Sequence, residues 1–167
     1  NVTVLALYLG QLLGLSSEQL RLLGEAAMMH DVGKIRIPKE ILNKQGLLTP
    51  AEWQVMESHT VEGAEVLNKV AGINSISLAV AFEHHLHYDL SGYPKTERLK
   101  EVNLFSRLVT ICDVYDAATS LRVYHAPVLP AKVIALIISK KGTFFDPVLA
   151  KAFVQMMGVY PVGSLVR

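Results

Sequence analysis

The segment HHLHYDLSGYP, residues 84–94, joins two adjacent histidines to a Ser-Gly-Tyr-Pro turn. Two adjacent histidines can both bind at one site only if the backbone turns there, or if the site holds two metal ions side by side. Serine, glycine and proline favour turns, so this segment is expected to present backbone and a tyrosine ring to a ligand. Further metal-ligand side chains occur in three other segments, which are His30-Asp31, His59 and Asp113.

The spacing of apolar residues predicts helices on both sides of this segment. Residues 76–85 form an apolar helix that ends at the two histidines, and residues 104–120 are apolar almost all round, which is typical of a buried helix. Capping boxes at Ser16 and Thr49 begin two more helices, the second of which carries Trp53, Met56 and His59. Other helices are predicted at 2–13, from Pro38 to 42, through 64–70, from Pro130 to about 141 and from Asp146-Pro147 to Met157.

These elements predict an all-α fold, a helical bundle with short connections, over residues 1–158. Residues 159–167 are interpreted as a turn that runs into a strand, at the start of a truncated C-terminal extension. Both ends lie inside predicted elements, which indicates a piece of a longer protein.

Composition narrows the class of protein. Hydrophobic residues make up 51% of the 167 residues, which is enough for one domain with a substantial core. No apolar run is long enough to cross a bilayer, and a net charge of +1 does not favour a nucleic-acid polymer as partner. The single cysteine, Cys112, excludes an internal disulfide and predicts the reducing cytoplasm as the location.

Two aspartates are hard to explain without a nearby cation. Asp31 follows Met28-Met29 at a helix C-terminus, where the helix dipole disfavours a negative charge. Asp113 lies inside the most apolar helix, where a carboxylate needs a partner or a metal ion. The alternatives are a capping role for Asp31 and an ion pair of Asp113 with Arg107 or Arg122.

The histidines also have simpler interpretations. His30 can be solvated beside a capping aspartate, and His59 can lie on the exposed face of an amphipathic helix. His84 and His85 can be basic residues favoured at a helix C-terminus. Surface positions are the preferred interpretation of the two remaining histidines, His87 and His125.

Together, four histidines and two aspartates offer nitrogen and oxygen ligands, which suit iron, manganese or zinc and do not fit a thiolate site. Their number exceeds what one ion takes, so two divalent ions are predicted. Two ions a few Å apart favour phosphoester hydrolysis, because they activate water and hold the phosphate oxygens during in-line attack. Lys34, three residues after Asp31, is predicted to place its charge on that phosphate.

With these residues in place, the chain resembles the HD-GYP domains, a subgroup of the HD metal-dependent phosphohydrolase superfamily. The resemblance covers nearly the whole chain. The matching motifs are HDVGK at 30–34, Ile37-Pro38, Leu48-Thr49-x-x-Glu52-Trp53, His59 with Gly63, His84-His85, Asp89-x-Ser-Gly-Tyr-Pro94, Asp113-Val-Tyr-Asp-Ala117, Ser120-x-Arg122-x-Tyr124 and Gly142-Thr-x-Phe145-Asp146-Pro147.

The resemblance implies a metal-dependent phosphodiesterase that hydrolyses cyclic di-GMP, a cyclic dinucleotide of bacterial signalling. It implies two or three divalent ions, iron or manganese, and as their ligands His30, Asp31, His59, His84, His85 and Asp113. The residues implied to contact the substrate are Lys34, Gly92, Tyr93 and Arg122, and the catalytic pair is Lys34 and Asp31. Expected partners are a regulatory or sensory domain in the same longer chain and a protein of the diguanylate cyclase type.

Four positions depart from the family pattern, and one of them is His125, which stands where a basic residue often follows Arg122 by three positions. Leu86 stands where a glutamate usually follows the two histidines, and Leu90 stands where a glycine precedes the Gly-Tyr-Pro turn. Leu121 replaces an aspartate before Arg122. Loss of an acid near the ligands loosens their orientation, and Leu90 adds bulk beside the substrate loop.

These departures support an alternative from another class of function. In it, the chain is a degenerate HD-GYP module that binds metal and nucleotide but signals through protein contacts without turnover. A third hypothesis is a phosphohydrolase that acts on another nucleotide. The complete set of six ligands favours the enzyme.

Overall fold

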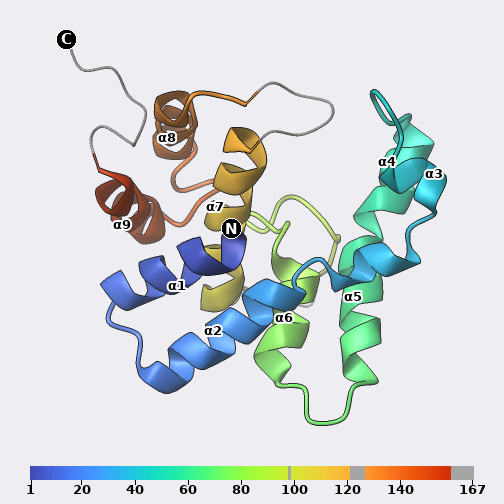
Figure 1. Cartoon of the computed structure of the whole chain (residues 1–167), viewed down its shortest axis with the longest axis horizontal. Coiled ribbons are helices and arrows are strands. Elements are labelled where there is room, and N and C mark those ends of the chain that lie inside the picture. Colours follow the sequence, from blue (N-terminus) through green and yellow to red (C-terminus); the bar gives the residue numbers. More distant parts are fainter. Residues whose placement is uncertain (98, 121–126, 159–167) are drawn as a thin grey trace.

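The computed structural model describes residues 1–97, 99–120 and 127–158. Within these ranges the chain is helical and forms isolated β-bridges but no strand, which confirms the predicted all-α fold (Figure 1). The elements are α1 (Val2–Leu12), α2 (Ser17–Met29), the 3-10 helix η1 (Val32–Arg36), α3 (Lys39–Leu42), α4 (Pro50–Glu57), α5 (His59–Asn68), α6 (Ser75–Glu83), α7 (Leu104–Thr119), α8 (Pro130–Ser139) and α9 (Pro147–Met157). The strand expected after residue 158 lies outside the described residues.

The hydrophobic core surrounds α7, as its apolar composition predicts. Eight of its residues are buried, and six of these form a core cluster with buried side chains of α1, α2, α6, α8 and α9. α8 and α9 lie at one end of the molecule, whereas α3 and α4 lie at the other (Figure 1). In the part of the chain that is described, no helix is both long and apolar enough to cross a membrane.

Both predicted capping boxes are present. The backbone N–H of Gln19 donates to Ser16 Oγ at 3.3 Å, and Ser16 N–H donates to Gln19 Oε1 at 2.8 Å. At the start of α4, Thr49 and Glu52 make the same reciprocal pair, with Pro50 at the first helical position. These local signals fix where α2 and α4 begin because they satisfy helix N–H groups that have no partner within the helix.

One predicted helix is divided in two. Trp53 and Met56 lie on α4, but His59 is the first residue of α5. At the junction, Ser58 donates from Oγ to the carbonyl of Val55 at 2.8 Å, and its N–H donates to the same carbonyl at 3.3 Å. This local bonding competes with the regular helix ladder and turns the chain at Ser58. The result places His59 at a helix start that faces the bundle.

The α3–α4 arm, residues 39–57, is the least buried part of the described bundle. None of its residues is buried, and none belongs to the hydrophobic core or packs against it. Lys44 Nζ instead holds the arm together by bonding both carboxylate oxygens of Glu52, at 2.8 and 2.5 Å. Polar contacts therefore set the shape of this arm.

Candidate metal centre

Four separate segments bring their polar side chains to one place. His30 ends α2, and Asp31 precedes η1. His59 begins α5, and His84 follows the last turn of α6. The ligand atoms of four residues all lie within 4.8 Å of one another, and these are Asp31, His59, His84 and His85.

Asp31 lies between two groups of side chains. Its Oδ1 is 3.4 Å from His59 Nε2 and 3.7 Å from His84 Nε2. Its Oδ2 is 3.4 Å from His30 Nε2, which is in turn 3.8 Å from Asp113 Oδ1. The two oxygens of one carboxylate thus face different histidines, and Asp113 extends the second group.

The hydrogen bonds of these histidines indicate that a cation fits between them. Nδ1 of His30 lies 2.7 Å from the Ala27 carbonyl, and Nδ1 of His59 lies 2.7 Å from the Met56 carbonyl. Nδ1 of His84 likewise approaches the carbonyls of Val80 and Ala81. Because carbonyls only accept, each Nδ1 carries the proton and each Nε2 presents a lone pair.

These lone pairs converge on a carboxylate. The Nε2 atoms of His59 and His84 are 3.3 Å apart, and Asp31 Oδ1 is buried without a hydrogen-bond donor. A buried, unpaired carboxylate oxygen next to facing lone pairs is costly without a positive charge. Nitrogen and oxygen donors of this kind suit a divalent transition-metal ion, so the residues fit the metal centre that the sequence predicts.

The electrostatics favour the metal-binding forms of His59, His85 and Asp31. Burial lowers the pKa of His59 to about 4 and that of His85 to about 2. Burial acts to lower the pKa of His30 as well, but contacts with Asp31 outweigh it and raise that pKa. Burial acts to raise the pKa of Asp31, but contacts with His30, His84 and Lys34 outweigh it and hold that pKa well below its usual range. Neutral imidazoles and an ionised carboxylate are what metal binding requires at neutral pH.

The surface interpretation of His59 is wrong, because its side chain is 1% exposed. His84 does lie at the C-terminal end of α6, but its side chain is fully buried. Arg107 donates to Asp146 at 2.7 Å and is therefore not the partner of Asp113. Arg122 and His125, the other two side chains that the sequence singled out, lie outside the described residues.

Gly33 allows the segment that carries Asp31 to lie directly on α5. A Cβ atom at this position would lie 1.9 Å from the His59 carbonyl oxygen and 2.5 Å from the Gly63 nitrogen. Both are backbone atoms, so no side-chain rotation would relieve the contact. The absence of a side chain at Gly33 thus places Asp31 beside His59.

Replacement of Gly33 by alanine is expected to lower the free energy of unfolding by at least about 3 kcal/mol, at the upper end of overpacking costs. Thermal or urea unfolding of the metal-free protein measures the change. Gly24→Ala is the matched control, because its Cβ would make only ordinary contacts with Leu7, and alanine is favoured over glycine inside a helix. A Gly33→Ala variant as stable as Gly24→Ala would contradict this account.

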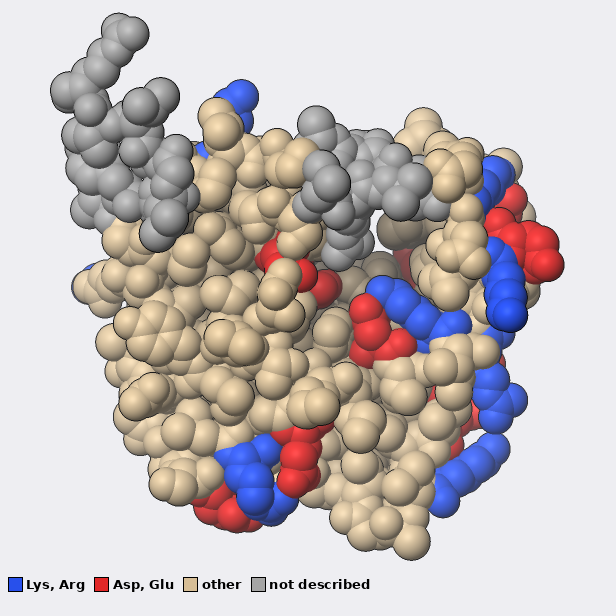
Figure 2. Space-filling view, in the orientation of Figure 1, with Lys and Arg blue, Asp and Glu red and all other residues tan. Residues whose placement is uncertain are grey.

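A cavity of about 510 Å³ opens next to the metal-centre residues. Its polar lining includes Lys34, His59, His85, Tyr93 and Asp113. Side chains of the α3–α4 arm line the other side, and the surface is visibly hollowed between this arm and the rest of the molecule (Figure 2). We call this space the central cavity.

Three of the four residues expected to contact substrate, Lys34, Gly92 and Tyr93, line two adjoining cavities. Lys34 lines the central cavity, and its Nζ donates to Asp31 Oδ2 at 2.5 Å. Tyr93 lines both the central cavity and a neighbouring one that contains Gly92. Burial raises the pKa of the Tyr93 phenol, helped by the charges of Glu57, Asp113 and Asp31, so its O–H remains a donor.

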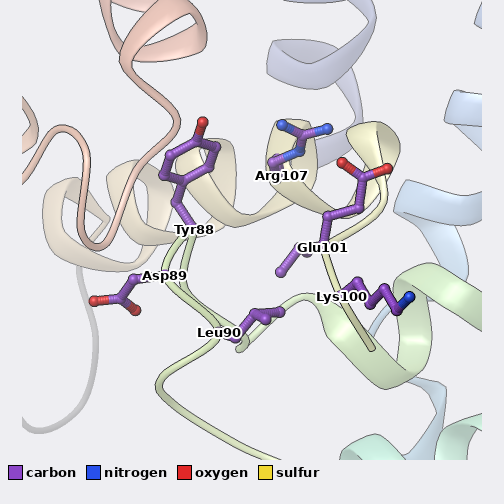
Figure 3. A pocket seen from close by; sticks show the side chains of 7 residues that line it. Tyr88, Asp89, Leu90, Lys100, Glu101 and Arg107 are labelled. Atoms are coloured by element: carbon purple, nitrogen blue, oxygen red, sulfur yellow. The ribbon is translucent and has the colours of Figure 1, made fainter. Parts of the chain in front are cut away.

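Two of the three leucines that depart from the family pattern, Leu86 and Leu90, do not line the central cavity, and the third, Leu121, lies outside the described residues. Leu86 is 2% exposed and lines a small pocket with Arg107 and Asp146. Leu90 has a positive φ of 66° and lines a separate pocket with Lys100 and Glu101 (Figure 3). Leu90 therefore does not line the central cavity, because the turn directs this side chain into the separate pocket.

Some residues that support the site could not be recognised in the sequence. Thr110 Oγ1 donates to the His84 carbonyl at 2.8 Å and ties the histidine turn to α7. His87 lies apart from the metal ligands, with Nδ1 2.7 Å from Ser91 Oγ and its ring stacked on Phe144. The apolar lining of the central cavity, which includes Leu47 and Leu48, was not predicted either, because exposed and buried leucines look alike in a sequence.

Comparison with known proteins identifies the family of this chain. The family model of the HD domain matches residues 1–149. The chain belongs to the HD-domain family. Its relatives include a cyclic di-GMP phosphodiesterase of Pseudomonas aeruginosa, which is 37% identical over 99% of this chain and 40% of the relative. A 3'3'-cGAMP-specific phosphodiesterase of Vibrio cholerae is 32% identical over 93% of this chain and 30% of the relative.

A solved structure confirms the HD-domain fold. A HDG"Y"P protein from Bdellovibrio bacteriovorus superposes with a TM-score of 0.75 at 19% identity, over 93% of this chain and 50% of that one. The HD domain described here spans less than half the length of the two phosphodiesterases that it resembles in sequence.

Proposed function

We propose that this HD domain hydrolyses a phosphodiester bond of a cyclic dinucleotide, with cyclic di-GMP as the first candidate substrate. The observation that carries the proposal is the position of Asp31, whose two oxygens face separate histidines at the edge of a cavity that also contains Lys34. The two phosphodiesterases named above support this class of substrate.

The proposed ligands fall into two groups that share Asp31. His59 and His84 approach Oδ1, and His85 lies in the same group, whereas His30 and Asp113 lie on the side of Oδ2. Two divalent ions, iron or manganese, are the proposed cofactors, and when bound they supply Lewis acidity for the attack of water on phosphorus. We propose that Lys34 and the Tyr93 hydroxyl orient the phosphate from within the cavity, together with Gly92 and Arg122.

The proposal includes a cytoplasmic location. Cys112, the chain's single cysteine, is a buried free thiol, which agrees with a reducing compartment. A sensory domain in the same polypeptide and a partner of the diguanylate cyclase type also belong to the proposal.

Product analysis tests the proposed reaction. The purified protein is loaded with Fe²⁺ or Mn²⁺ without oxygen, incubated with cyclic di-GMP or 3'3'-cGAMP, and its products are separated by chromatography. We expect a linear dinucleotide to form in the presence of metal and not after chelation.

Two outcomes would contradict the phosphodiesterase. Intact cyclic dinucleotides after hours with the metal-loaded protein would favour the alternative, a module that signals without turnover. Hydrolysis of only other nucleotides would favour the third hypothesis. Comparing the hydrolysis rates of cyclic di-GMP and 3'3'-cGAMP shows which of the two substrates this domain prefers.

A further inference from the structure

We propose that Trp53 and its apolar neighbours in the α3–α4 arm form a seat for one nucleobase of the substrate. This inference rests on the proposed function, because it concerns the same central cavity. It assigns a specificity-determining role to a side chain on the side of the cavity opposite the metal-centre residues.

The central cavity has two chemically different sides. Lys34, His59, His85 and Asp113 provide charge and metal ligands on one side. The α3–α4 arm provides the apolar side, with the side chains of Ile41, Leu42, Leu47, Leu48, Trp53 and Met56. A ligand that fills this cavity therefore combines a charged group with an apolar, flat or bulky one.

The apolar side chains of the arm are not needed for a core. Leu47 is 87% exposed and Trp53 is 48% exposed, and no residue of the arm is buried. Exposed apolar side chains that gather around one cavity are typical of a binding surface, whereas side chains that pack in a core are buried. Because folding leaves this apolar surface in water, its burial against a ligand would stabilise the complex.

The arm holds this surface in a fixed place. The ion pair between Lys44 and Glu52 closes the loop that carries Leu47, and the capping box at Thr49 fixes the start of α4 one turn before Trp53. Preorganised side chains lose little entropy when a ligand binds. The indole ring is therefore available at the cavity without rearrangement of the arm.

A nucleotide has both groups that the cavity recognises. Its phosphate suits the metal centre and Lys34, and its base has a flat π-face that stacks on an aromatic ring whatever its hydrogen-bonding pattern. Tryptophan provides the largest such face among the side chains. Leu42, Leu47 and Leu48 add apolar surface around it.

Tryptophan fluorescence tests the seat directly, because Trp53 is the single tryptophan of the chain. The metal-loaded protein is titrated with a phosphorothioate-linked cyclic di-GMP, which resists hydrolysis, and with ribose 5-phosphate, which has no base. We expect saturable quenching by the cyclic dinucleotide and none by ribose 5-phosphate. Binding of the analogue, measured by equilibrium dialysis, without any change in fluorescence would overturn the proposal.

Variants measure what the stack contributes. Trp53→Leu is expected to raise the KM for cyclic di-GMP at least about 5-fold, the lower end of the effect of removing one aromatic–base stack. Metal content and kcat are expected to stay near those of the wild type, and Trp53→Phe is expected to restore most of the affinity. Tyr8→Leu is the matched control, because Tyr8 is an exposed aromatic on α1 that does not line the cavity.

The outcomes separate this proposal from the proposed function. Hydrolysis by Trp53→Leu with wild-type KM would overturn the seat and leave the phosphodiesterase intact. Quenching by the cyclic dinucleotide without hydrolysis by the wild type would support the seat and contradict the enzyme. A Trp53→Phe variant as weak as Trp53→Leu would also overturn stacking as the cause.

Discussion

Asp31→Ala is expected to leave the protein without bound metal and to lower turnover of cyclic di-GMP at least about 10³-fold. Asp31 is the only residue in the described part of the chain whose carboxylate approaches the Nε2 atoms of His30, His59 and His84. Its loss would leave both groups of proposed ligands without their shared anion. A metal centre contributes several kcal/mol to phosphoester hydrolysis, and about 1.4 kcal/mol corresponds to tenfold in rate.

Metal content and thermal stability measure this effect without an activity assay. A metal that binds only the folded state stabilises it by about 4 kcal/mol at 1,000 times its Kd. Chelation is therefore expected to lower the Tm of the wild type but not that of Asp31→Ala. Glu65→Ala, which removes an exposed carboxylate from α5, is the matched control and is expected to behave like the wild type. An Asp31→Ala protein with wild-type metal content would contradict the metal centre described here.

Most of the fold could be predicted because its signals are local. The capping boxes at Ser16 and Thr49 and the apolar composition of α7 each predict an element that the structure contains. The division between α4 and α5 could not be predicted, because it depends on the hydroxyl of Ser58, which bonds back to the carbonyl of Val55. A serine at that position in the sequence is equally compatible with a continuous helix.

The metal-centre residues could be predicted because a buried charge without a partner is rare. Asp113 within an apolar helix and Asp31 after two methionines both favoured a nearby cation, and the structure places a carboxylate oxygen of each within 3.8 Å of His30 Nε2. The seat around Trp53 could not be predicted, since exposed and buried leucines look alike in a sequence. Only the absence of buried residues in the α3–α4 arm distinguishes its leucines from those of the core.

The positions of the Leu86 and Leu90 side chains could not be predicted from the sequence either. Both positions depart from the family pattern near the proposed ligands, so the sequence favoured an effect on the site. The structure directs Leu86 toward Arg107, whose Nε is buried without a hydrogen-bond partner. An acid at position 86 would therefore meet Arg107 and not the metal ligands, which weakens the argument for a degenerate module.

Lys34→Ala is the variant that separates an enzyme from a binding module. The ammonium group of Lys34 lies 2.5 Å from Asp31 Oδ2 and lines the central cavity, but it is not a metal ligand. It is positioned to stabilise the charge that builds on the phosphate oxygens as water attacks. Loss of one such group costs on the order of 10²-fold in turnover, or about 3 kcal/mol of transition-state stabilisation.

The expected pattern for Lys34→Ala is a kcat about 10²-fold lower with metal content and Tm close to those of the wild type. Lys39→Ala is the matched control, because Lys39 is an exposed lysine of α3 that does not line the cavity. A loss of metal in Lys34→Ala would instead mean that Lys34 acts by holding Asp31. An unchanged kcat would show that Lys34 does not contact the reacting phosphate. Either result would remove its catalytic role while leaving the test of Asp31 unaffected, because metal binding by Asp31 is measured independently of turnover.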